Sequence, residues 1–354
     1  MAIGYHAERQ MKMTLLLREM FDELPHFCRD FFRAIADVTS ALTRIGYAYD
    51  LRIFFRFLSE ECPEFGGKPI TAFTAADLAK VTADHLEEFM EYMSYYVVNR
   101  DEKRFAEHQN GERGKSRKLS AVRTMFSYFY KRRKIPSNPS ELIDMPKIHE
   151  KNIVTLEADE VAKLLDEVES GENLTPRQKQ FHAYTKARDT AIVSLLLGTG
   201  MRVSECVGVD VNHLDFGVNG VKVTRKGGNE AVLYFNGEVE EALRRYLAAR
   251  GELLAGVKDE DADALFLSLQ RRRINVRTVQ NLVKKYSALV TTLKNISPHK
   301  LRSTFGTQLY RESGDIYLVA ETLGHANVDT TRKHYARMDD ERRRKAAEFV
   351  HLRQ

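Results

Sequence analysis

Apolar residues recur every three to four positions through much of the first half of the chain, which is the spacing of a helix with one buried face. Segments 13–36 and 40–60 follow this spacing, and the first of them predicts an extra N-terminal helix within residues 1–36. A turn rich in proline and glycine follows at 63–69. Beyond the turn, Thr82 or Asp84 is a candidate N-cap for a helix that runs to about residue 99.

Polar residues interrupt the helical pattern at 100–115, which predicts an exposed loop. Helical spacing resumes at Ser116 and continues to Tyr130. Large apolar side chains occupy one face of this segment, and Lys118 and Arg123 lie on the other. We therefore expect an amphipathic helix with a basic face.

Three prolines between residues 135 and 146 end the helical run and mark a change of domain. We expect a helical domain over 1–147, a linker over 148–155 and a second domain over 156–354. The second domain begins with a helix near Glu157 and contains a long apolar helix at 187–198.

Short strand-like segments follow in the second domain, at 214–216, 220–224 and 231–235. The last two flank a Lys-Gly-Gly-Asn turn, which is typical of a β-hairpin. Helical spacing then returns and ends in a basic amphipathic tail at 339–352. The pattern predicts a mostly α protein, in which a helical N-terminal domain precedes an α+β, mainly helical, domain with a small antiparallel sheet.

The distribution of charge indicates a partner. The 354 residues include 55 basic and 50 acidic side chains, a net charge of +5. Residues 1–100 have 11 basic against 15 acidic side chains, whereas 103–134 have 11 against 2 and 271–354 have 18 against 8. Two basic blocks in a nearly neutral chain indicate two surfaces that face one polyanion, most simply nucleic acid, although solvated helix faces would give the same pattern.

Composition excludes several other classes of protein. No apolar run approaches the ~20 residues that span a bilayer, and the N-terminus lacks a signal-peptide pattern. Cys28, Cys62 and Cys206 are odd in number and too widely spaced for a disulfide framework or a zinc cluster. We expect a soluble protein of a reducing cytoplasm.

The second domain contains four segments with basic, imidazole and phenol side chains at close spacing. Their candidate residues are Arg202, Glu205, Lys226, His299, Arg302, His325 and Tyr335. His299 and Arg302 are three residues apart and so share a helix face. Taken singly, each has an ordinary explanation as a cap, a surface charge or a core residue, but together they indicate one chemistry.

That chemistry is phosphoryl transfer. Two arginine side chains match the non-bridging oxygens of a phosphodiester and stabilise the charge of its transition state. Histidines donate hydrogen bonds or move protons, a lysine with a lowered pKa protonates a leaving oxygen, and Tyr335 is available as the nucleophile. The sequence shows no carboxylate cluster for two magnesium ions, no phosphate-binding glycine loop and no zinc-binding helix motif. A metal-free transfer through a covalent tyrosine is the interpretation that remains.

These motifs resemble those of the tyrosine recombinase (phage integrase) family. The C-terminal match comprises His-x-x-Arg at 299–302, Leu-Gly-His at 323–325, and Tyr335. The segment Thr-Gly-Met-Arg-Val-Ser-Glu at 199–205 is similar to the family's first arginine motif.

The resemblance extends into the first domain and so covers nearly the whole chain. Segments 47–58, 118–123 and 135–139 are similar to the SAM-like core-binding domain of Xer-type members. The resemblance implies a site-specific recombinase that cuts and rejoins double-stranded DNA through a 3′-phosphotyrosine, for integration or excision of a mobile element or for resolution.

Roles for the reacting residues follow from the resemblance. Tyr335 would attack the phosphate, and His334 and Tyr310 are rivals that do not hold the family's nucleophile position. Arg202 and Arg302 would hold the phosphate during the attack.

The remaining motif residues would support this reaction. Lys226 would protonate the leaving 5′ oxygen, with Arg225 or Lys222 as rival cations. His299 would assist proton movement at the nucleophile. His325 would hydrogen-bond the phosphate, and Glu205 would orient the cationic cluster.

The resemblance also implies partners and no cofactor. Two domains would close round duplex DNA with short core sites, and a homotetramer would join two sites, with the 339–352 tail packed on a neighbouring protomer or in its own. Accessory proteins are compatible with this assembly, and the expected location is the bacterial cytoplasm, at the nucleoid. The candidate DNA contacts are Lys115, Arg117, Lys118, Arg123, Arg225, Arg271, Arg272, Arg273 and Lys300.

Two alternatives to recombination are open at this point. A type IB topoisomerase-like enzyme would use the same chemistry to relax DNA without exchanging strands. A DNA-binding relative that has lost catalysis would keep the fold, although the complete set of Arg, Lys, His and Tyr residues argues against this second alternative.

Overall fold

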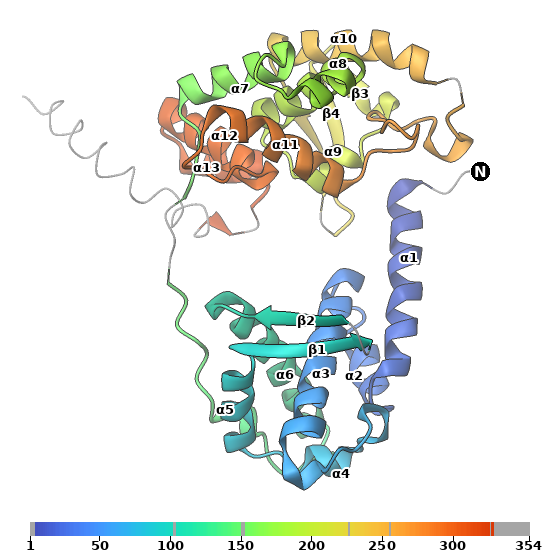
Figure 1. Cartoon of the computed structure of the whole chain (residues 1–354), viewed down its shortest axis with the longest axis vertical. Coiled ribbons are helices and arrows are strands. Elements are labelled where there is room, and N and C mark those ends of the chain that lie inside the picture. The colour runs from blue at the N-terminus through green and yellow to red at the C-terminus, as the bar shows by residue number, and fades with distance from the viewer. Residues whose placement is uncertain are drawn as a thin grey trace, which may run out of the picture. The chain divides into compact units, whose positions relative to one another are not determined.

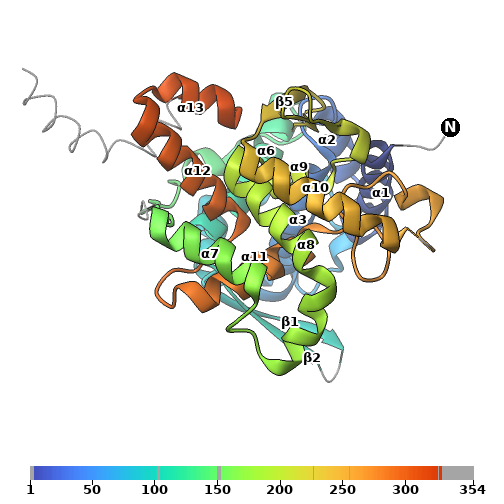
Figure 2. The same ribbon diagram turned by 90° about the horizontal axis from the view of Figure 1, so that it is seen from above.

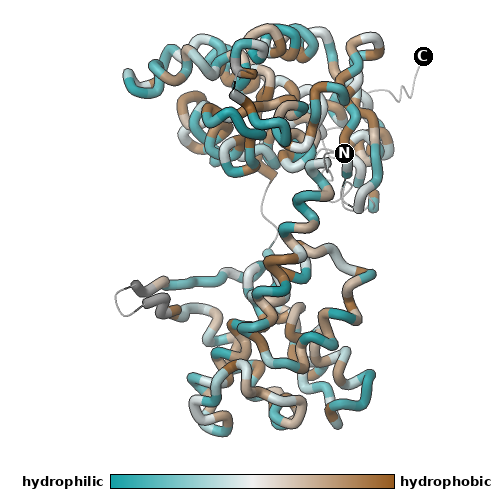
Figure 3. The backbone as a smooth tube through the Cα atoms, turned by 90° about the vertical axis from the view of Figure 1, so that its right-hand side faces the viewer, coloured by the Kyte–Doolittle hydropathy of each residue, from teal (hydrophilic) through white to brown (hydrophobic). Residues whose placement is uncertain are grey.

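The computed structural model of the chain describes residues 4–101, 104–149, 153–225, 227–254, 256–325 and 327–328. The chain divides into two compact units, Met1–Lys151 and Asn152–Gln354 (Figure 1). Helices dominate both, which confirms the predicted mostly α fold class. Figure 3 shows hydrophobic and hydrophilic residues mixed along the helices, and none of the helices described is long and apolar enough to cross a membrane.

The first unit is built round one long helix, α3. The elements of this unit are α1 (Tyr5–Met20), α2 (Cys28–Ala34), α3 (Ala41–Glu61), α4 (Ala75–Leu78), α5 (Ala83–Tyr92), β1 (Tyr95–Asp101), β2 (Arg104–Gln109) and α6 (Glu112–Lys131). Ser40 starts α3 by accepting a hydrogen bond from the Thr43 backbone N–H. Phe54 of α3 is fully buried, and its ring contacts Phe89 of α5 and Phe126 of α6, which fixes these three helices together.

The prediction of one extra helix within residues 1–36 is wrong in its extent. The segment contains two helices, since α1 ends at Met20 and α2 begins at Cys28. Pro25 lies between them, and a proline cannot donate the backbone hydrogen bond that a continuing helix needs.

The prediction of a helix to residue 99 followed by a loop at 100–115 is also wrong. The helix ends at Tyr92, and β1 and β2 form an antiparallel hairpin that pairs Tyr95 with Gln109. Aromatic and β-branched residues fill the start of β1 and favour a strand. The Tyr96 ring also stacks between Tyr92 and His108, with centroids 5.2 and 5.1 Å away.

The second unit surrounds α8. Its elements are α7 (Ala158–Ser170), α8 (Pro176–Thr199), α9 (Val203–Val207), β3 (Leu214–Asp215), β4 (Gly220–Thr224), β5 (Glu230–Tyr234), α10 (Gly237–Leu253), α11 (Val276–Val290), α12 (Pro298–Ser313) and α13 (Ile316–Leu323). Helices α7, α10 and α12 all pack against α8 (Figures 1 and 2).

Helix α8 begins earlier than the predicted start at residue 187. Thr175 accepts a hydrogen bond from the Gln178 backbone N–H, and the Gln178 side chain accepts one from Thr175 in return. Pro176 occupies the first helical position, where proline is favoured. The predicted segment 187–198 is the apolar half of a longer helix.

The small antiparallel sheet is present as predicted. Its strand order is β3-β4-β5, and β4 pairs with β5 from Gly220–Tyr234 to Thr224–Glu230. Val221 and Val223 are buried beneath it. The hairpin therefore has one face on the core of the unit, and this packing fixes where its turn emerges.

Candidate active site

A glycine at the end of α8 places the first candidate arginine. Gly200 has a left-handed backbone (φ 62°), and its N–H donates to the Leu196 carbonyl at 3.1 Å. The chain reverses there, so that Arg202 becomes the N-cap of α9. Glu205 accepts from the Arg202 backbone N–H and from Arg202 Nη1, both at 2.7 Å. The buried Glu205 carboxylate thus fixes the direction of this guanidinium.

We expect Gly200→Ala to destabilise the second unit by about 2–4 kcal/mol, from left-handed strain and overpacking together. A Cβ at this position would overlap the Phe305 ring and lie 2.9 Å from Leu323. Urea unfolding followed by circular dichroism measures this loss. Gly237→Ala is a matched control, because nothing lies within 4 Å of a Cβ there. Equal stability of the two variants would contradict this account.

Arg302 joins two helix ends. It lies on α12 and is 6% exposed. Its Nη1 donates to the Gly200 carbonyl at 2.7 Å, and its Nη2 donates to the Leu323 carbonyl. Because the carbonyl end of a helix is partly negative, the end of α13 stabilises this buried charge.

Two further arginines reach the same end of α13. Arg202 Nη2 donates to the Gly324 carbonyl at 3.3 Å, and Arg225 Nη2 donates to the Thr322 carbonyl at 3.2 Å. The end of α13 therefore gathers three guanidinium groups that come from distant parts of the sequence. The sequence prediction brought Arg202 and Arg302 together, whereas it considered Arg225 only as a rival cation to Lys226 and as a DNA contact.

His325 follows directly on this cluster. Gly324 ends α13 in a left-handed conformation (φ 62°), and the His325 backbone N–H donates to the Ala320 carbonyl at 2.9 Å. The backbone of His325 is therefore fixed next to the end of α13 that the three arginines contact. His299 is exposed on the first turn of α12, one turn before Arg302. Lys226, Tyr335 and the predicted 339–352 tail lie outside the described residues.

The basic residues of α6 differ in what they contact. Lys118 is 6% exposed and donates to Asn110 Oδ1 at 2.6 Å, and Lys115 donates to Ser94 Oγ at 2.5 Å. Arg123 lies 3.5 Å from the Ile143 carbonyl. Arg117 is exposed and forms an ion pair with Asp50 of α3. The Lys118 ammonium is therefore buried and bonded within the unit, whereas the Arg117 side chain is exposed to solvent.

The basic residues of the second block also separate into two groups. Arg273 is internal, because it donates to the Val207 and Val209 carbonyls and pairs with Asp210 at 2.5 Å. Arg271 and Arg272 are exposed in the turn before it, and Lys300 is half-buried on α12; these three stay candidates for DNA contacts.

Asp50 is a buried carboxylate beside Arg117. Burial raises its pKa from 3.8 to about 6, against the lowering effect of Arg117 and Lys118. Oδ1 of this carboxylate has no hydrogen-bond partner among the described residues. A proton on Asp50 therefore favours the folded state, which is unusual for a carboxylate in an ion pair.

We expect the stability of the first unit to fall as pH rises from about 4 to about 6. Between these values the folded protein keeps a proton on Asp50 that the unfolded chain releases, which amounts to about 2 kcal/mol in favour of folding at the acidic end. Asp50→Asn should lose this pH dependence. Hydrogen exchange of α3 peptides across this pH range measures the change, and equal slopes in the two proteins would show that Asp50 is not responsible.

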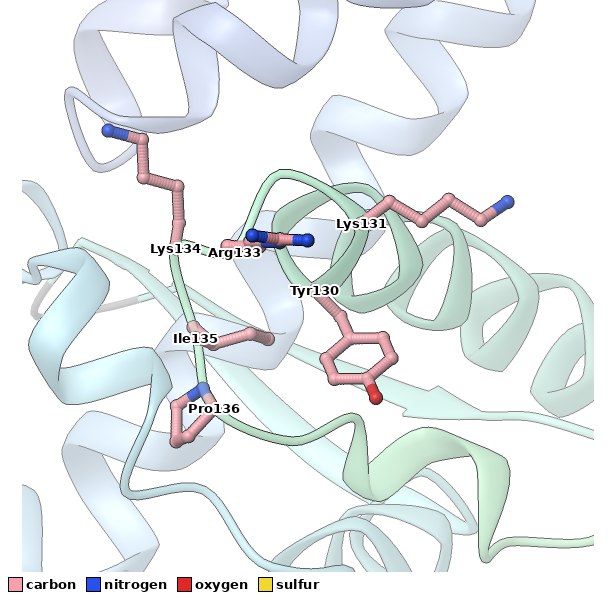
Figure 4. Close-up of a pocket in the computed structure, with 6 residues that line it drawn as sticks. All are labelled: Tyr130, Lys131, Arg133, Lys134, Ile135 and Pro136. Atoms are coloured by element: carbon pink, nitrogen blue, oxygen red, sulfur yellow. The ribbon is translucent and has the colours of Figure 1, made fainter.

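A hollow lies at the end of α6. It is lined by Tyr130, Lys131, Arg133, Lys134, Ile135 and Pro136 (Figure 4). In Figure 4 the Lys131 and Lys134 side chains point in different directions and do not converge on one point. The hollow is therefore a basic surface rather than a small-molecule pocket. Elsewhere, the described residues include no group of three or more His, Cys, Asp or Glu side chains that could hold a metal ion.

Comparison with known proteins decides the family. Residues 154–342 match the model of the phage integrase family. The tyrosine recombinase XerC of Caldanaerobacter subterraneus subsp. tengcongensis is 33% identical over 308 residues, which are 85% of this chain and 79% of that protein. The chain belongs to the phage integrase family of tyrosine recombinases.

Other relatives agree with this conclusion. XerC of Chlorobaculum tepidum is 29% identical over 301 residues, 82% of this chain and 84% of the relative. A crystal structure of the XerH site-specific recombinase bound to palindromic difH substrate shares the fold, with a TM-score of 0.62, 21% identity, and coverage of 88% and 80%. A lambda integrase dimer bound to a core site has a TM-score of 0.57, 16% identity, and coverage of 87% and 94%.

Membership confirms the predicted function and enzyme class. Tyrosine recombinases cut and rejoin DNA, so the chain is a DNA-cleaving and DNA-rejoining enzyme of the site-specific recombinase type. The relatives do not favour the two alternatives, topoisomerase-like relaxation and loss of catalysis.

Proposed function

We propose that this recombinase cuts double-stranded DNA with Tyr335 as the nucleophile while Arg202 and Arg302 hold the scissile phosphate. The observation that carries this proposal is the meeting of both arginines at the end of α13, immediately before His325. Each guanidinium has five N–H donors. In this proposal the two guanidinium groups bind the non-bridging oxygens of the phosphate, which their planar geometry matches.

In this proposal the reaction consists of two successive transesterifications at the scissile phosphate. The Tyr335 oxygen forms a bond to phosphorus as the bond to the 5′ oxygen breaks, which leaves a 3′-phosphotyrosine. The Lys226 ammonium gives its proton to the leaving 5′ oxygen, and His299 assists removal of the phenol proton. A 5′ hydroxyl from the partner strand then reverses the attack, so the phosphodiester bond is restored without a cofactor.

The arginine cluster supplies electrostatic stabilisation in this scheme. The attacked phosphate gains negative charge as the transition state forms, and fixed guanidinium groups stabilise that charge without rearranging. Glu205 keeps Arg202 in place and His325 donates a hydrogen bond to a phosphate oxygen. Arg302 needs no carboxylate for its orientation, since two backbone carbonyls already hold it.

The proposed partner is duplex DNA with short core sites. The XerH and lambda integrase structures named above are complexes with DNA. We assign phosphate contacts to Lys115, Arg117, Arg123, Arg271, Arg272 and Lys300. We leave out Lys118 and Arg273 because their side chains are buried, and Arg225 because it donates to the end of α13. Binding of this kind weakens steeply with salt.

The proposed assembly is a homotetramer on two synapsed sites, held in part by the 339–352 tail in a neighbouring protomer. The biological role would be integration, excision or resolution of DNA at the bacterial nucleoid, with accessory proteins where a site requires them. Sedimentation of the protein with a duplex that carries two sites would report the tetramer.

Covalent capture tests the proposed function. A pool of nicked duplexes with a randomised core is incubated with the protein, because a break beside the cleavage point lets the released fragment diffuse away and traps the adduct. Adducts are isolated on a denaturing gel and digested for peptide mapping. We expect a single nucleotide-linked peptide, modified at Tyr335 through a 3′ phosphate. A 5′ linkage, a different modified residue, or DNA binding without any adduct would contradict the proposal.

A further inference from the structure

The side chain of Arg225 connects two parts of the site. It follows β4 directly, and its Nη2 donates to the Thr322 carbonyl of α13 at 3.2 Å. Its guanidinium also lies against Gly324, where a Cβ would overlap it and would lie 2.9 Å from Nε. Arg225 therefore joins the end of the hairpin to the end of α13.

The hairpin turn beside Arg225 is closed mainly by its own backbone. The Arg225 N–H donates to the Asn229 carbonyl at 2.7 Å, and the Gly228 N–H donates to the Arg225 carbonyl at 3.1 Å. Gly227 and Gly228 both have positive φ (95° and 88°), and nothing lies within 4 Å of a Cβ at either position. A turn of two glycines in open space has little packing of its own, so the Arg225 side chain is well placed to limit its motion.

Gly324 also contacts a different arginine. Arg202 Nη2 donates to the Gly324 carbonyl at 3.3 Å, while Arg225 packs at the Gly324 Cα. Gly324 thus contacts both the arginine assigned to the phosphate and the arginine that precedes Lys226. The residue after Gly324 is His325. A shift of the hairpin would therefore change the positions of Arg202, Lys226 and His325 relative to one another.

We propose that Arg225 is a positioning residue, which holds the turn that includes Lys226 at a fixed place relative to Arg202 and His325. This inference rests on the proposed function, in which Lys226 protonates the leaving 5′ oxygen. Arg225 is not assigned a DNA contact in this account, and its described side-chain contacts are the Thr322 carbonyl and Gly324. Its effect on the reaction passes through Lys226.

Replacing the leaving 5′ oxygen by sulfur distinguishes a role in positioning Lys226 from a role in phosphate binding or in folding. In a duplex with a 5′-bridging sulfur at the scissile phosphate, the leaving group is a thiolate. Thiols have a pKa near 8.5, far below that of an alcohol, so a thiolate leaves without needing a proton from a general acid. A defect that arises from a misplaced Lys226 disappears with sulfur, whereas a defect in phosphate binding or in folding does not.

The experiment compares single-turnover cleavage of two nicked duplexes that differ only in the leaving atom, oxygen or sulfur. Cleavage is measured as the covalent protein–DNA adduct on a denaturing gel. We expect Arg225→Gln to cleave the oxygen substrate about 10–100-fold more slowly than the native protein, and the sulfur substrate within about threefold of it. Lys226→Ala should show the same pattern with a larger loss, about 10²–10⁴-fold. Arg245→Gln is the control on α10, since Arg245 is exposed and pairs with Glu241 at 2.8 Å, and both substrates should be cleaved at the native rate.

Each outcome has a separate meaning. Equal slowing of both substrates by Arg225→Gln, or no slowing of either, overturns the positioning role while the function stands. Failure of sulfur to restore Lys226→Ala contradicts instead the proposed role of Lys226. If Arg225→Gln does not fold, Arg225→Lys provides the same comparison, because it keeps the positive charge but loses the planar fork that spans Thr322 and Gly324.

Discussion

Tyr335→Phe is expected to abolish the covalent protein–DNA adduct, with a loss of at least about 10⁴-fold in single-turnover cleavage. The change removes only the phenol oxygen, which is the atom that bonds to phosphorus in the proposed reaction. The phenyl ring stays, so affinity for duplex DNA in a gel-shift assay at constant salt should change by less than about twofold. Gel-shift and denaturing-gel measurements on one preparation separate binding from chemistry.

Tyr310→Phe is the matched control. Tyr310 is only 6% exposed and packs with Val319 and Leu323 in a small hydrophobic cluster, so a DNA phosphate has no access to it. This variant should form the adduct at close to the native rate. An adduct that persists in Tyr335→Phe but is lost in Tyr310→Phe would reverse our assignment of the nucleophile, and one that persists in both would direct attention to His334.

Arg302→Ala is expected to slow cleavage by about 10³-fold, the scale seen when one fixed donor to a developing charge is removed. It should also loosen the site, because the same side chain holds the Gly200 and Leu323 carbonyls. Arg302→Lys should recover little of the rate, since a single ammonium cannot donate to both carbonyls and to a phosphate with the geometry of a guanidinium. Single-turnover rates with saturating DNA measure both variants.

Arg311→Ala provides a control on the same helix. Arg311 is half-exposed at the other end of α12 and pairs with Glu157 at 2.7 Å. An exposed pair of this kind contributes little to stability, about 0–1 kcal/mol, so this variant should cleave within about twofold of the native protein. A comparable loss in Arg311→Ala and Arg302→Ala would show that the helix as a whole, and not the Arg302 side chain, is responsible.

The fold class could be predicted from the sequence because hydrophobic spacing is a local property. Segment 40–60 became α3 almost residue for residue, and the hairpin was found from its Lys-Gly-Gly-Asn turn. The predicted ends of helices and strands were wrong where a local side-chain interaction overrides the hydrophobic pattern. The pairing of Thr175 with Gln178 extends α8. The aromatic stack round Tyr96 accompanies two strands where the end of a helix and the start of a loop were expected.

The arrangement of the candidate site was only partly predictable. Motif spacing indicated that Arg202, Arg302 and His325 belong together, but spacing gives no direction for a side chain. That Arg225 turns inward to α13, and that Lys118 and Arg273 are buried in internal hydrogen bonds, depends on which carbonyls tertiary packing brings near them. Charge alone makes all three candidates for DNA contacts.

The end of α13 has a consequence for how such an enzyme avoids accidental damage. The side chains of Arg202, Arg225 and Arg302 take their acceptors from three consecutive residues, 322–324. If this last helical turn unwinds, all three arginines lose one anchor in the same event, so their positions are coupled. An enzyme that cuts and rejoins DNA gains a safeguard from this coupling, because the arginines proposed to hold the phosphate share one structural support.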